Sequence, residues 1–422
     1  MFKSIKYIMV TFFVCVSLQI LAYCIPSDAI ANNITESSNT LKNGGVYTVA
    51  PEYYSMRIDT FTDAWMLDIA AWSGNEPILQ KAFGSYYYDF SQIHDEVGGS
   101  GPWTALEKIS AGNGDLPRGS YARYWHGYIF FLRLALMAMD YTDIRVINSI
   151  LLLLLSFYLF YVLTQEKKEC CFPFVCFLII LCPLSAFFCM AYTGVIFLSL
   201  ISSIFLIKFK FVKHNFSFSE LYPIYIIFGM LTSWIDILSF PLITLGVPLI
   251  FTISFIDSTS YKEAIWRVLK LSIYWGLGYA GMWIMKWVLS SIILNVNVIS
   301  DAIGAARIRS SAKAGDLIQD ISTMDVILQT WKVICKKPYI IFYVVSILTA
   351  CLQFMRIEKK AIDKKRVSSL LVVSFYPIAW CFLMKNHTYG HFLFTFRIWG
   401  ISIFALTLIP CMYLSGSKKL YK

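Results

Sequence analysis

Asp59, Asp63 and Asp68 stand four and five residues apart in a stretch that is otherwise mostly apolar. A carboxylate can take a proton from an attacking hydroxyl and so act as a general base. Apolar residues recur at helical spacing after Thr62 and Asp63, which predicts that Asp63 lies at or just before a helix N-terminus. An aspartate there also serves as a helix cap. Its place directly after the first apolar segment of the chain favours catalysis.

Two cationic and aromatic runs, 118–128 and 385–397, supply the complementary chemistry. Transfer from a phosphate leaving group needs fixed cations that hold the phosphate while its negative charge grows. Aromatic rings suit the apolar face of a sugar or the head of a lipid, although tyrosine and tryptophan also line membrane boundaries without a ligand. The candidate binding residues in these runs are Arg123, Tyr124, Trp125, His126, His387, His391 and Arg397.

Two further ionisable residues fall at membrane depth. Lys286 lies in the outer half of an apolar run, and Asp236 lies at the turn between two short runs. Such groups are costly in a membrane and usually mark a site or a pathway, so both are candidate substrate-binding residues. The alternative for Lys286 is a side chain that extends outward to the interface.

Motifs for metals and soluble nucleotides are weak. His387 and His391 share a spacing with metal ligands, but no HExxH signature and no third ligand accompany them, so no zinc site is predicted. Binding of a divalent cation such as Mg²⁺ or Mn²⁺ near Asp63 stays an open alternative, and no other cofactor is predicted. The sequence lacks a P-loop and a dinucleotide fingerprint.

The composition indicates a membrane protein. Of 422 residues, 58% are hydrophobic and 17% aromatic, and the mean hydropathy is +0.62. The net charge of +10 comes from Lys and Arg in short segments between apolar runs, which is typical of membrane topology and not of nucleic-acid binding. Most of the 11 cysteines lie inside apolar runs, so no disulfide framework is predicted.

The apolar runs predict an all-α polytopic protein, a single membrane domain over 1–422, with about ten spans. These runs are 7–25, 144–163, 172–190, 192–207, 221–235, 238–256, 271–294, 338–354, 367–384 and 398–414.

The basic segments predict that both termini are cytoplasmic. This orientation makes 26–143 a large first outer loop and 295–337 a second one. Within the first loop, 126–139 is too short to span and is predicted to be an interfacial or re-entrant helix. The second loop is unusually basic for the outer side, which indicates either a negatively charged partner or a solvated loop.

These pieces resemble the GT-C superfamily of integral membrane glycosyltransferases. The resemblance rests on 62–67, 120–128, 232–242 and 386–391, and on a first outer loop with interfacial helices. It is closest to bacterial proteins of surface-polysaccharide synthesis, which implies a multi-pass protein of the bacterial inner membrane.

The resemblance implies inverting transfer from a polyprenyl-phosphate-linked sugar to a glycan or lipid-linked acceptor, with membrane lipids around the protein. Asp63 would be the base, and Arg123, Lys286, His387, His391 and Arg397 would be phosphate or sugar ligands. Many relatives have two adjacent acidic residues, which this loop lacks, so Asp59 and Asp68 stay alternatives. A transporter or flippase, or a polymerase or ligase of lipid-linked saccharides, is the alternative function, although no repeated halves are visible.

Overall fold

The computed structural model describes residues 2–44, 47–48, 53–92, 101–112, 116–212, 217–313, 320–354 and 363–415. Helices make up most of these residues, and the described strands pair into two short sheets of two strands each. Seven helical segments among them are long and apolar enough to cross a membrane. The predicted all-α membrane architecture is therefore confirmed, whereas the count of about ten spans stays a prediction.

The candidate spans alternate with shorter helices. They are Ile5–Ala22, Tyr141–Glu166, Met190–Phe211, Phe218–Ile235, Tyr261–Leu294, Lys364–Leu383 and Phe392–Met412. The corresponding helices are α1 (Phe2–Ala22), α7 (Tyr141–Glu166), α10 (Met190–Phe205), α11 (Leu221–Ile235), α13 (Tyr261–Leu294), α17 (Lys364–Ser374), α18 (Tyr376–Leu383), α20 (Phe392–Thr395) and α21 (Trp399–Ser415). The remaining helices of the bundle are α8 (Cys171–Leu181), α9 (Pro183–Ala186), α12 (Ile243–Phe255), α16 (Lys337–Phe354) and α19 (Lys385–Gly390).

Glycine lets two of these helices approach closely. A Cβ atom on Gly229 of α11 would lie 2.0 Å from the carbonyl oxygen of Trp275 in α13. In the same way, a Cβ on Gly278 of α13 would lie 2.0 Å from the carbonyl oxygen of Ile226. Small residues at helix contacts are the usual means of tight packing in membranes, where the hydrophobic effect does not drive helices together. This contact fixes α11, whose end leads into the candidate site.

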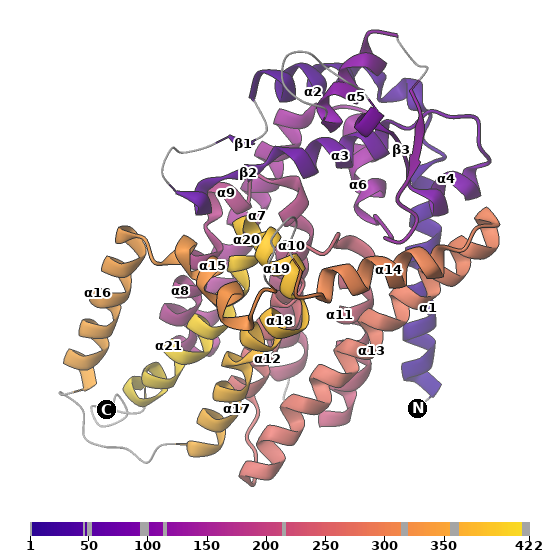
Figure 1. Cartoon of the computed structure of the whole chain (residues 1–422). Coiled ribbons are helices and arrows are strands. Elements are labelled where there is room, and N and C mark those ends of the chain that lie inside the picture. Colours follow the sequence, from indigo (N-terminus) through magenta and orange to yellow (C-terminus); the bar gives the residue numbers. More distant parts are fainter. Residues whose placement is uncertain are drawn as a thin grey trace.

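The first predicted outer loop folds into a cap at one end of the bundle (Figure 1). Its helices are α2 (Ala31–Gly44), α3 (Thr60–Ala71), α4 (Ile78–Gly84), α5 (Pro102–Ser110) and α6 (Tyr128–Leu136), and its strands are β1 (Tyr47–Thr48), β2 (Ile58–Asp59), β3 (Tyr86–Tyr88) and β4 (Arg118–Ser120). Both strand pairs are antiparallel.

Helix α6 occupies the centre of the segment predicted to be interfacial or re-entrant. A nine-residue helix is only about 14 Å long and cannot cross a hydrocarbon layer. Its Arg133 is buried and donates to the carbonyl oxygens of Ala70 and Ile25. The cation therefore ties α6 to the end of α3 and to the chain just after α1.

The second predicted outer loop contains α14 (Val298–Ser310) and α15 (Thr323–Ile334). Helix α14 runs across the bundle below the cap (Figure 1). The start of α1 and the end of α21 lie at the other end of the bundle, away from the cap. The terminal Lys418, Lys419 and Lys422, on which the predicted orientation partly depends, lie outside the described residues.

Candidate functional site

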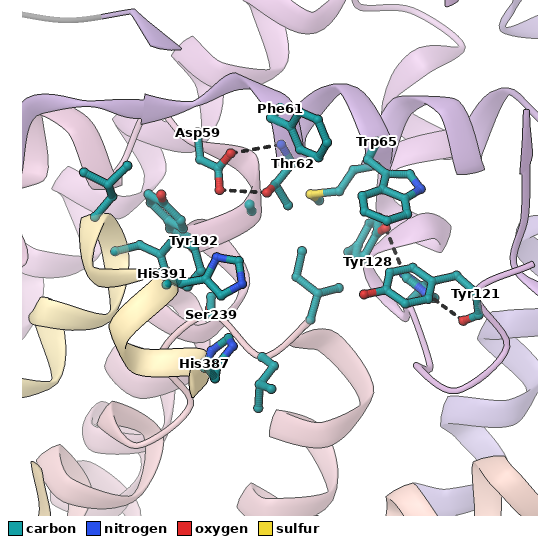
Figure 2. A pocket seen from close by; sticks show the side chains of 18 of the residues that line it. Asp59, Phe61, Thr62, Trp65, Tyr121, Tyr128, Tyr192, Ser239, His387 and His391 are labelled. Atoms are coloured by element: carbon teal, nitrogen blue, oxygen red, sulfur yellow. Dashed lines mark hydrogen bonds between the residues drawn. The ribbon is translucent and has the colours of Figure 1, made fainter. Parts of the chain in front are cut away.

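A cavity of about 290 Å³ lies between the cap and the bundle (Figure 2). Its walls come from segments far apart in sequence: the start of α3, the chain before α6, the start of α10, the turn after α11, the end of α14, and α19 with α20. Its polar and aromatic lining includes Arg57, Asp59, Phe61, Thr62, Trp65, Tyr121, His126, Tyr128, Tyr192, Ser239, Arg309, His387 and His391.

Asp59 is the one of the three predicted aspartates that lines this cavity. It is the N-cap of α3 and accepts hydrogen bonds from the Thr62 amide at 3.0 Å and the Thr62 hydroxyl at 2.7 Å. Each carboxylate oxygen has one of these bonds, which leaves acceptor capacity on both. Burial raises the pKa of Asp59 above its ordinary value, although the two bonds from Thr62 and the charge of Arg397 oppose the rise. Of the three aspartates, Asp59 is therefore the one whose carboxylate is open to the cavity.

Asp63 lies one helical turn further along α3 and is fully buried. Its carboxylate accepts hydrogen bonds from the Tyr141 hydroxyl at 2.8 Å and from the amides of Met190 at 3.2 Å and Ala191 at 2.9 Å, and it contacts the Cys189 thiol at 3.4 Å. The two amides have no acceptor within α10 because they lie at its N-terminus, where a negative charge is favourable. Burial nevertheless raises the pKa of Asp63 to about 6. Asp63 therefore anchors α10 to the cap and does not line the cavity.

Asp68 supports the cap. It is fully buried and accepts a hydrogen bond from the Tyr88 amide at 3.0 Å, at the end of β3. Burial holds the pKa of Asp68 well above its ordinary range. Asp68 does not line the cavity. The three aspartates therefore differ in environment: Asp59 faces the cavity, Asp63 binds the start of α10, and Asp68 binds β3.

Arg309 and the two predicted histidines form a cluster on the opposite wall. The Arg309 guanidinium donates to His391 Nε2 at 2.6 Å and to His387 Nδ1 at 3.3 Å. A histidine nitrogen that accepts from arginine must be unprotonated. Burial, with the charge of Arg309, lowers the pKa of His391 to about 4, and burial lowers the pKa of His387 well below its usual range. The neutral rings therefore orient the Arg309 cation toward the cavity.

Arg57 is a second cation in the lining. Its guanidinium carbon lies 4.4 Å from the centre of the Tyr54 ring. Within the described part of the chain, neither Arg57 nor Arg309 forms an ion pair with a carboxylate. Two cations without a paired carboxylate in one cavity favour an anionic ligand. No local pattern singled out Arg57 as a binding residue, and Arg309 was indicated only by the basic excess of the second outer loop.

Aromatic rings form the rest of the wall. Trp65 of α3 stacks on Tyr121 with ring centres 4.9 Å apart and planes inclined by 10°. His126 adopts a left-handed backbone conformation with φ of 55°. Its ring is held between the Tyr128 hydroxyl at 3.0 Å and the Tyr121 carbonyl oxygen at 3.3 Å. Burial lowers the pKa of His126 to about 3, so this predicted residue is a neutral part of the lining.

Three predicted cations bind protein groups outside this cavity. Arg123 pairs with Asp301 of α14 at 3.1 Å. Lys286 is fully buried and donates to the Phe83 carbonyl oxygen at 3.0 Å. Arg397 is also fully buried, and it donates to the Leu181 carbonyl oxygen at 2.9 Å, among other acceptors. These side chains hold the cap and the bundle together around the cavity.

The other predicted binding residues also have protein partners. Trp125 is buried and donates to the Met282 carbonyl oxygen at 2.7 Å, and Tyr124 is buried against Trp283. Asp236 accepts from the amides of Leu238 and Ser239, both at 3.0 Å. These bonds shape the turn that brings Ser239 to the cavity wall.

A second hollow of about 420 Å³ adjoins the cavity. It is lined mainly by apolar residues of α6, α7, α10 and α11, and it shares Met66, Tyr128, Ala191 and Ile237 with the cavity. Its lining residues Phe131 and Ile201 are 51% and 50% exposed, so the hollow reaches the outer surface of the bundle. We call it the apolar groove.

Comparison with protein-family models, curated proteins and solved structures finds no match to this chain. Among the described residues, no group of three or more His, Cys, Asp or Glu side chains is arranged to hold a metal ion. The geometry of the cavity and the groove is therefore the basis for assigning a function.

Proposed function

We propose that this chain is a membrane glycosyltransferase that moves a sugar from a polyprenyl-phosphate carrier to a glycan or lipid-linked acceptor. The observation that carries the proposal is the union of a polar cavity and an apolar groove through four shared residues. A ligand that fills both must have a polar head and a long apolar tail. A lipid-linked sugar phosphate has this form.

The lining of the cavity supports each part of such a head group. Arg57 and Arg309 suit the phosphate, because arginine makes several hydrogen bonds to phosphate oxygens in a fixed geometry. The stacked rings of Trp65 and Tyr121 border the same space and suit the apolar face of a sugar. The tail would leave past Met66 and Tyr128 into the groove.

Asp59 is the base in this proposal. An acceptor hydroxyl gives its proton to Asp59 while its oxygen forms a bond to the anomeric carbon of the sugar. The bond from that carbon to the phosphate oxygen breaks, and the electron pair leaves with the phosphate. Arg57 and Arg309 stabilise the negative charge that develops there. Attack on the face opposite the phosphate would invert the configuration.

The proposal is tested with the purified chain in lipid nanodiscs. Polyprenyl-phosphate-linked sugars would be supplied with glycan acceptors, and release of free polyprenyl phosphate would be measured. The expected result is release that depends on the acceptor and is lost in Asp59→Asn. Movement of intact donor across a proteoliposome membrane, without release, would instead favour a flippase.

A further inference from the structure

Helix α15 packs on the bundle through one face only. Val326 and Val333 are buried on that face. Thr330 is also buried and accepts a hydrogen bond from the Trp399 indole at 3.0 Å. The helix is therefore fixed in its rotation about its own axis, and its opposite face has a defined orientation.

That opposite face is apolar and exposed. Met324, Leu328 and Trp331 are 60%, 51% and 42% exposed, and one edge of Trp331 contacts the Trp399 ring, with ring centres 5.4 Å apart. Their spacings of four and three residues place them in one stripe along the helix. A continuous exposed apolar stripe marks contact with a membrane or a partner.

Lysines lie beside and beyond the stripe. Lys332 follows Trp331 on α15, Lys336 lies between the two helices, and Lys337 is the first residue of α16. Among the described residues, none of the three forms an ion pair with a carboxylate, although Lys332 reaches the amide oxygen of Gln329 at 3.0 Å. Part of the excess positive charge of the second predicted outer loop therefore lies next to the apolar stripe of α15.

Helix α16, which follows α15 in the chain, also exposes apolar residues. Ile340, Ile341 and Val344 of α16 are 46%, 62% and 48% exposed. Helix α16 has 18 residues, and α15 adjoins its upper end in Figure 1. The stripe therefore lies close to the point where an apolar helix of the bundle begins.

We propose that α15 is a membrane-interface helix that binds anionic phospholipids. Met324, Leu328 and Trp331 enter the acyl region, and the lysines contact the phosphate groups. The exposed apolar residues of the adjoining α16 and the lysines beside the stripe favour an anionic bilayer over a protein partner. The proposal is independent of the transferase function.

Photo-crosslinking identifies the occupant of the stripe. The photoreactive residue p-benzoylphenylalanine would replace Leu328, and a matched chain would carry it at Leu79 of the cap, which is 45% exposed. After irradiation in native membranes, the expected adduct at position 328 has the mass of a phospholipid and exceeds the lipid adduct at position 79. An adduct with another protein, or no excess over position 79, would overturn the proposal.

Charge substitution tests the lysines. Lys332→Gln with Lys337→Gln would be compared with Lys81→Gln and Lys108→Gln in the cap, which remove the same charge. Enrichment of phosphatidylglycerol over phosphatidylcholine around the protein would be measured in mixed nanodiscs. Each interfacial lysine contributes about a fivefold preference, so the first pair should lose most of the enrichment and the second pair little. Equal loss in both, or none in either, would contradict the assignment.

Discussion

Replacing Asp59 by asparagine and replacing Asp63 by asparagine should have different effects on the rate of sugar transfer. Only the first should lower it strongly. In Asp59→Asn, the side-chain oxygen can still accept from the Thr62 amide, which is 3.0 Å away, so α3 keeps its cap. The asparagine NH2 would face the Thr62 hydroxyl, which can turn to accept instead of donate. The variant can no longer take a proton. Loss of a general base lowers the rate by about 10²–10⁴-fold, or about 3–5 kcal/mol in the barrier.

In Asp63→Asn the affected contacts lie behind the cavity wall, at the start of α10, where the Ala191 amide binds Asp63. The Met190 and Ala191 amides donate to different carboxylate oxygens, and asparagine replaces one of these oxygens with NH2, so one of the two amides loses its partner. We expect the turnover of each correctly folded molecule to stay within about tenfold of the original, because a shift of α10 disturbs only the Ala191 and Tyr192 part of the wall.

The assay is release of polyprenyl phosphate by each purified variant, divided by the fraction of folded protein from size-exclusion chromatography. Asp68→Asn is the matched control, since Asp68 is buried in the same cap but does not line the cavity. Full turnover in Asp59→Asn together with a hundredfold loss in Asp63→Asn would refute our choice of base and restore Asp63.

Four further changes test Asp63, Arg309, the apolar groove and the contact between α11 and α13. The pKa of Asp63 is about 6 in the folded chain against an ordinary 3.8, so the stability it contributes is present below pH 4 and is lost as the pH rises through 6. Asp63→Asn should therefore flatten the fall in melting temperature between pH 4 and 7. Arg309→Leu should lower kcat/KM by about 10²–10³-fold, with partial recovery in Arg309→Lys, in steady-state kinetics. Ala135→Phe, in the groove, should raise KM for long-chain donors but not for short-chain ones. Gly229→Val should lower the free energy of unfolding by about 1–3 kcal/mol in denaturant titrations, because its side chain overlaps the α13 backbone.

Hydropathy predicted the bundle better than it predicted breaks within a run. Hydropathy predicts one span over 172–190, whereas in the structure α8 ends at Leu181 and α9 begins at Pro183. Cys182 between them has a left-handed backbone conformation with φ of 57°. A residue before proline disfavours helical geometry, so the Cys182 and Pro183 pair was the local signal of this break.

The sequence predicted only some of the residues that form the candidate site. Asp59, His126, His387 and His391 were predicted and line the cavity, but Arg309 was noted only as part of a basic loop. Its significance depends on contact with two histidines that lie 78 and 82 residues away. No local pattern reports such a contact, because it arises from the packing of α14 against α19.

The start and the orientation of α3 determine which aspartate faces the cavity, and the sequence alone did not define either of them. Helix α3 is buried along most of its length, so its apolar residues lack the one-sided period that would reveal its orientation. Its start lies at Thr60, one turn before the predicted position, because Asp59 and not Thr62 or Asp63 provides the cap. A shift of one turn changes which carboxylate precedes the helix and which one points into its packing.

The donors around each carboxylate then decide its role. A buried charge is tolerable only when several hydrogen bonds stabilise it, and Asp63 has them from Tyr141, Met190 and Ala191. Those same bonds hold the carboxylate in place and occupy the lone pairs that a proton acceptor needs. Asp59 has bonds from Thr62 alone and an opening to the cavity. The aspartate that is less satisfied by the protein is therefore the one available to a substrate.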